Sequence, residues 1–167
     1  MIRDRFHVLI AALFALLLQA CVTAPPPARS STPAPTASRP PALSTERQWL
    51  QSWFKDTPVQ IAQDGDGRIS VEVPREHSFD AGRSAVRAPL AAVLDKVAES
   101  LRRNPQTRLS LVAAPADAGS SPALAMQRAA QVRAHLQMRG VAPPRLAEAS
   151  RTSLAAVQLR LEPMAAH

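Results

Sequence analysis

The spacing of apolar residues changes repeatedly between positions 69 and 140, and this pattern constrains the fold more than any other feature. Residues 69–73 alternate apolar and polar side chains, which is typical of a half-buried strand. Residues 90–101 place their apolar residues on one helical face, and residues 109–112 are richly apolar and predict a short central strand. A second helix is predicted for Pro122–Arg139, with Gly140 as its C-terminal cap.

The residues on either side of this stretch add a helix, a hairpin and further strands. Ser44 or Thr45 can cap a short helix that contains both tryptophans and ends at Pro58, and we expect it to pack on the domain as a lid. A partner-binding helix is the alternative. Asp64–Gly67 is a strong hairpin turn between residues 59–61 and 69–73, because Asp and Gly tolerate positive φ.

Two strands are expected after the second helix, the first as a short strand at Arg145–Ala149 and the last at residues 157–161, where apolar residues alternate. Strands that alternate with two long helices predict an α/β (α+β) two-layer sandwich, with the helices on one face of a mixed sheet. Aromatic residues make up 4% of the chain and Tyr is absent, so the core must be built from Leu, Val and Ala.

The first 44 residues have the features of an exported lipoprotein. Charged residues at positions 1–5 precede a largely apolar run, Phe6–Leu18, which has the length of a signal-peptide core and is short for a membrane span. The segment Leu18-Gln19-Ala20-Cys21 resembles the bacterial lipobox, which implies cleavage after residue 20 and acylation of Cys21. Because Cys21 is the single cysteine, a disulfide within the monomer is excluded.

Val22 follows Cys21, so no Asp stands there as an inner-membrane retention signal, and lipoprotein sorting by analogy favours the periplasmic face of the outer membrane. Residues 21–44 are rich in proline and lack large apolar runs, and we expect an extended linker. The formal charge of +7 is compatible with nucleic acid, anionic lipid or an acidic polymer, or with a compositional preference for Arg. Predicted export and the absence of a nucleic-acid motif argue against nucleic acid.

Two groups of residues between positions 69 and 162 have the spacing of known motifs. The first is the run Phe79-Asp80-Ala81-Gly82, which follows a predicted strand, and the second is Arg128-Ala129, Val132, Leu136 and Gly140-Val141. They resemble the F-x-x-G-x-x-x-L and R-A-x-x-V-x-x-x-L-x-x-x-G-[IV] motifs of the OmpA-like peptidoglycan-associated domain, which Pal-type lipoproteins also contain, and the resemblance covers residues 69–162. The predicted domains are therefore a signal peptide at 1–20, a lipidated linker at 21–44, a helix and hairpin at 45–68, an OmpA-like domain at 69–162 and a tail at 163–167.

The resemblance implies non-covalent binding of the peptide stem of peptidoglycan, commonly through diaminopimelate. The family uses an Asp at the end of one strand and an Arg in the next helix, and Asp117 and Arg128 are their counterparts here. An Arg can bind a carboxylate through two parallel hydrogen bonds. Binding requires no nucleophile or general base, so we expect no enzymatic activity and no cofactor; the histidines lack the spacing of metal ligands, and no metal site is expected.

The ligand-binding loops depart from the family pattern. Ala114-Pro115-Ala116-Asp117 stands where the family has G-H-T-D, and eleven positions separate Asp117 from Arg128 instead of fifteen. Two hypotheses remain. The chain is either an outer-membrane lipoprotein that tethers the membrane to the cell wall, or a scaffold lipoprotein that acts through protein contacts in an envelope or secretion assembly.

Overall fold

The computed structural model describes residues 43–165. Their elements follow the order α2 (Ser44–Trp53), β1 (Gln60–Gln63), β2 (Ile69–Pro74), α3 (Arg75–Ser78), α4 (Ala88–Arg103), β3 (Thr107–Pro115), α5 (Pro122–Met138), a 3₁₀ turn η1 (Pro143–Arg145), β4 (Ala149–Thr152) and β5 (Ala156–Pro163). The predicted signal peptide, Cys21 and nearly all of the predicted linker lie outside the described residues. Within those residues, no helix combines the length and apolar character that crossing a bilayer requires.

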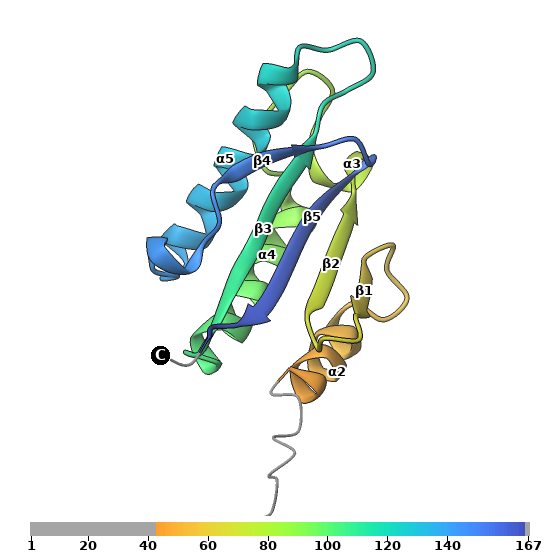
Figure 1. Cartoon of the computed structure of the whole chain (residues 1–167). Helices are drawn as coiled ribbons and strands as arrows, with labels where there is room; N and C mark the ends of the chain where they lie inside the picture. Colours follow the sequence, from red (N-terminus) through yellow and green to blue (C-terminus); the bar gives the residue numbers. More distant parts are fainter. Residues whose placement is uncertain (1–42, 166–167) are drawn as a thin grey trace, which may run out of the picture. The chain divides into compact units, whose positions relative to one another are not determined.

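The five strands form one mixed sheet in the order β1-β2-β5-β3-β4. β3 and β4 pair in parallel, and the other neighbours pair antiparallel. Figure 1 shows α4 and α5 on the same face of this sheet. The predicted α/β sandwich, with its N-terminal helix and hairpin, is therefore confirmed.

The helix α4 forms where its apolar periodicity predicted it. Pro89 lies in the first turn, where its missing N–H costs no helical hydrogen bond. The five apolar residues that define the predicted face are all buried against the sheet: Leu90, Val93, Leu94, Val97 and Leu101. Asn104 caps the end of the helix, and its side-chain amide donates to the carbonyl of Ser100 at 2.8 Å.

The helix α5 begins at the predicted Pro122 and ends at Met138, one residue before the predicted end, and its buried face contains a charge. Ser121 caps its start by accepting a hydrogen bond from the N–H of Ala123 at 3.2 Å. Gly140 follows its end with φ of +85°, a conformation that glycine adopts without strain. Among the apolar residues that line the sheet, this helix also buries Arg128 completely. A charge at such a position must be paired, because an isolated buried ion is very costly.

The region after α5 differs from the prediction. The short strand expected at Arg145–Ala149 is wrong in position: Arg145 ends the 3₁₀ turn, Leu146 forms a single bridge with Leu109, and the strand is β4. The turn forms at two consecutive prolines, and the side chain of Arg145 then turns inward to hydrogen-bond backbone carbonyls. β3 is internal, as predicted, but β5 occupies the middle of the sheet.

The N-terminal helix α2 packs against β1 and α4. Leu50 is fully buried and Trp49 lies against the core, whereas Trp53 keeps 53% of its surface exposed. The ammonium of Lys96, on α4, lies 3.7 Å from the centre of the Trp53 ring, and Arg103 stacks 3.6 Å from that of Trp49. These cation–π contacts, together with Leu50, hold the helix on the domain.

Candidate functional site

Asp117 and Arg128 meet at the end of β3, where the strand passes into the loop before α5. β3 ends at Pro115, so Asp117 lies just beyond the sheet. Arg128 projects from the second turn of α5 towards the same point. The structure therefore brings together the two residues that the sequence selected, and pairs them with each other.

The guanidinium of Arg128 uses all of its five N–H groups within the protein. Nη1 and Nη2 each donate to one carboxylate oxygen of Asp117 at 2.9 Å, which is a bidentate pair. The other three N–H groups donate to the backbone carbonyls of Arg83 at 2.9 Å, Pro115 at 3.0 Å and Asp80 at 3.1 Å. The side chain is 0% exposed. Arg128 thus joins α5 to the end of β3 and to the loop that precedes α4.

The carboxylate of Asp117 is held from several sides. Besides Arg128, the backbone N–H of Gly82 donates to it at 2.7 Å. The Nε atom of Arg75 lies 3.8 Å from its Oδ1 atom. The hydrogen bonds from Arg128 and Gly82, with the positive charges of Arg128 and Arg75, lower the pKa of Asp117 below its ordinary value although partial burial opposes this. Asp117 is therefore a carboxylate at neutral pH, and 19% of its side chain remains exposed.

The loop between α3 and α4 contacts both Asp117 and Arg128. Phe79 is buried, and the guanidinium carbon of Arg128 lies 4.8 Å from the centre of its ring. Gly82 adopts a φ of +68°, which turns its N–H towards Asp117 and disfavours any residue with a Cβ. The F-D-A-G run singled out in the sequence is thus part of the site because its backbone, more than its side chains, contacts the charged pair.

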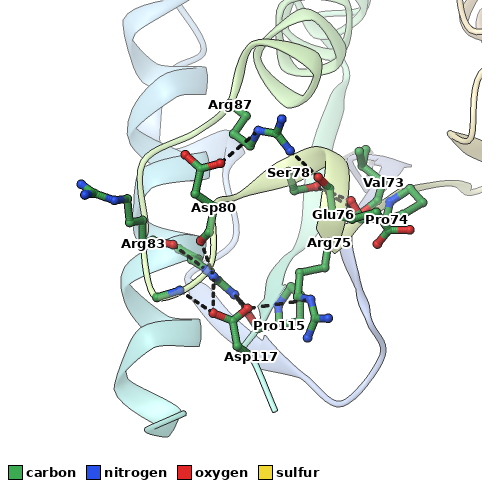
Figure 2. A network of polar contacts seen from close by, with 12 residues as sticks. Val73, Pro74, Arg75, Glu76, Ser78, Asp80, Arg83, Arg87, Pro115 and Asp117 are labelled. Carbon is green, nitrogen blue, oxygen red and sulfur yellow. Dashed lines mark hydrogen bonds and ion pairs between the residues drawn. The ribbon is translucent and has the colours of Figure 1, made fainter. Parts of the chain in front are cut away.

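A hollow of about 300 Å³ opens beside the pair. Its lining combines charged and apolar side chains from α3, the following loop and the segment after β3: Arg75, Glu76, Phe79, Ala81, Asp117 and Ala118. Figure 2 shows Arg75 next to Asp117, with the contact between them drawn, and Glu76 beside Arg75 on α3. Arg128 does not line this hollow, since Asp117 and the loop cover it.

Arg75 is the site residue that the sequence did not reveal. It is the first residue of α3, a four-residue helix that is too short to produce a recognisable apolar periodicity. No motif includes Arg75. Its position is the only indication of a role, because Arg75 directly follows β2 and the end of β2 lies near the end of β3. A prediction of the strand order would have been needed to place it.

A second hollow, of about 380 Å³, lies between the start of α5 and the end of β4. Its lining consists of small or hydroxyl side chains and one charged residue, Arg151. Neither Asp117 nor Arg128 contributes to it. Across residues 43–165, no group of three or more His, Cys, Asp or Glu side chains is arranged to hold a metal ion.

No protein-family model and no curated protein matches the sequence. Solved structures do match the fold. A MotB-like protein from Desulfovibrio vulgaris aligns with a TM-score of 0.58 and 15% identity, over 71% of this chain and 90% of that one. The cell wall anchor of the T6SS from Pseudomonas aeruginosa aligns with a TM-score of 0.56 and 20% identity, over 71% and 96%.

The periplasmic domain of Helicobacter pylori MotB (residues 97–256) aligns with a TM-score of 0.54 and 19% identity, over 64% of this chain and 85% of that domain. At these identities the likeness establishes the fold. Residues 43–165 therefore have the OmpA-C-like fold that the periplasmic domain of MotB also has.

Proposed function

We propose that this chain is a lipid-anchored protein of the outer membrane that binds the peptide stem of peptidoglycan and so tethers the membrane to the cell wall. The fold supports this, because one similar structure is that of a cell wall anchor. The proposed anchor is Cys21, and the proposed ligand-binding residues are Asp117 and Arg128. The role is one of binding, so none of these residues acts as a catalyst.

The observation that carries the proposal is the charged pair beside the hollow at the end of β3. Asp117 is ionised and partly exposed, so it can accept a hydrogen bond from an ammonium group of a ligand. Arg128 has no remaining N–H group in this structure. A ligand carboxylate reaches Arg128 only by displacing Asp117; otherwise Arg128 acts by fixing Asp117 at the edge of the hollow.

The first test is sedimentation of the purified protein with purified peptidoglycan sacculi. The wild type should sediment with the sacculi, and a soluble stem peptide containing diaminopimelate should release it. Asp117→Asn should weaken retention, whereas Asp66→Asn, an exposed carboxylate in the β1–β2 hairpin, should leave it unchanged. Failure of the wild type to sediment would contradict the proposal. Circular dichroism must show that the Asp117 variant is folded.

The second test concerns the anchor. Metabolic labelling with a palmitate analogue should mark the wild type and not Cys21→Ser, and the wild type should fractionate with the outer membrane. A variant that is still labelled, or a wild type that is never labelled, would contradict the anchor without affecting the binding proposal.

The alternative function, a scaffold that acts through protein contacts, is supported by two observations. Arg128 is fully occupied inside the protein, and Trp53 exposes about half of its surface on α2. If the wild type fails to sediment with sacculi, Trp53→Ala tests the scaffold: it should remove proteins that crosslink to the wild type in the cell envelope.

A further inference from the structure

We propose that Arg75 binds a carboxylate group of the ligand, and that the hollow accepts the free end of an amino acid, with its ammonium and carboxylate groups together. This inference rests on the proposed function and identifies which groups of the stem enter the site. It assigns to Arg75, on α3, the contact that the sequence assigned to Arg128.

Arg75 is fixed at its backbone and available at its side chain. Its N–H donates to the carbonyl of Ala155 at 2.9 Å, which attaches the start of α3 to the turn before β5. Its side chain is 37% exposed and lines the hollow. Within residues 43–165 the structure records one polar contact of this guanidinium, the 3.8 Å approach of Nε to Asp117. That distance is too long for a hydrogen bond.

The contacts of Arg128 explain why the guanidinium of Arg75 makes no hydrogen bond to Asp117. Asp117 offers two oxygens, and both are already bound by Arg128, with Gly82 bound to one of them. The charge of Asp117 is thereby balanced inside the protein. Arg75 lines the hollow and is partly exposed, and its terminal N–H groups fit a carboxylate in the bidentate geometry.

Glu76 provides the complementary charge. It is exposed, follows Arg75 directly and lines the same hollow. The lining thus presents the guanidinium of Arg75 for the carboxylate of an amino acid, and the carboxylates of Asp117 and Glu76 for its ammonium group. A hollow of about 300 Å³ lies at the small end of the range for ligand sites, and suits such a terminus better than a sugar chain.

The structure therefore favours a stem residue with a free carboxylate over one whose carboxylate is amidated. Amidation removes the negative charge and leaves Arg75 without its partner. The loss of one charge-assisted hydrogen bond at a partly exposed site corresponds to about a tenfold decrease in affinity.

The test is calorimetric titration of the purified full chain with two stem tripeptides, identical except that the diaminopimelate carboxylate is free in one and amidated in the other. The wild type should bind the free acid about tenfold more tightly than the amide. Arg75→Gln should lower the affinity for the free acid to that of the amide and leave the affinity for the amide unchanged. Arg75→Lys should restore part of the preference, and Arg160→Gln, an exposed arginine on β5, should retain all of it.

Each outcome separates the two proposals. If the wild type binds sacculi and both tripeptides equally, or if Arg75→Gln keeps the preference, the inference about Arg75 is wrong while the proposed function stands. If the wild type binds neither sacculi nor tripeptide, both are wrong. The midpoint of thermal unfolding should be the same for Arg75→Gln and the wild type, because the side chain of Arg75 makes no recorded hydrogen bond within the described residues.

Discussion

Two arginines hold opposite ends of the strand β3, and their surroundings differ in one respect. At the start of the strand, Arg145 donates to the carbonyls of Thr107 at 2.8 Å, Leu101 at 2.7 Å and Asn104 at 2.8 Å. At its end, Arg128 donates to three carbonyls and to both oxygens of Asp117. Both arginines join a helix to the sheet, but only the second is paired with a carboxylate in these contacts.

The difference separates a structural contact from a candidate binding site. Burial lowers the pKa of Arg145, since backbone dipoles replace water around its charge without a compensating anion. Beside Arg128, the ionised Asp117 draws in a third charged residue, Arg75, and a hollow opens along them. The pair of Asp117 and Arg128 is therefore the feature that distinguishes the two ends of β3, and substitutions in it test this difference.

The largest effect is expected from Arg128→Leu. The substitution removes a fully buried guanidinium and leaves Asp117 without its ion-pair partner and three carbonyls, one of them buried, without their donor. Breaking a buried ion pair on one side costs about 3–5 kcal/mol, so unfolding in urea should require much less denaturant. Arg160→Leu removes an exposed arginine and should change the free energy of unfolding by less than about 0.5 kcal/mol. Equal stability of the two variants would refute a structural role for Arg128.

A smaller effect is expected from Arg145→Leu. Its recorded partners are backbone carbonyls and include no carboxylate, so the substitution leaves no anion without its partner. Hydrogen bonds that involve a charged group contribute about 1.5–3 kcal/mol, and the loss should fall in this range. The variant should also bind sacculi as the wild type does, because the opposite end of β3 is untouched. Weakened binding at full folding would show that the two ends are coupled.

The pH dependence of the stability of Asp117→Asn tests the acidic partner of Arg128. The folded-state pKa of Asp117 lies below its ordinary value, so its stabilisation is fully present above about pH 4 and is lost as pH falls through the folded-state pKa. At pH 7 the variant should be less stable by about 1–3 kcal/mol. The difference from the wild type should stay constant from pH 7 to 5 and shrink below about pH 4. A difference that grows on acidification would contradict the assigned ionisation.

The sequence predicted the features that depend on apolar periodicity or on a motif. The faces of α4 and α5 follow from apolar spacing, and motif resemblance selected Asp117 and Arg128, which the structure pairs. Their role in ligand binding stays a prediction. The full burial of Arg128 was not foreseen, because nothing in the chain distinguishes it chemically from the other arginines.

Sequence reasoning failed where the determining contact is long-range. The strand expected at Arg145–Ala149 is displaced because Arg145 turns inward to bind carbonyls on β3 and α4, some 40 residues earlier. Arg75 was missed for a similar reason. Arg75 follows β2 and Asp117 follows β3, and the two residues come close only because these strands lie on either side of β5.

The smallest effect is expected from Ser121→Ala, which examines how the helix carrying Arg128 begins. The Ser121 hydroxyl accepts from the N–H of Ala123, whereas Arg87, the N-cap residue of α4, makes no such side-chain bond. Loss of an N-cap costs about 1 kcal/mol, and Ser120→Ala, which removes a hydroxyl without a recorded hydrogen bond, should cost close to nothing. If the cap also helps to orient Arg128, Ser121→Ala should speed amide hydrogen exchange at Gly82, whose N–H bonds Asp117. Unchanged exchange there would mean that the buried pair is held by its own contacts alone.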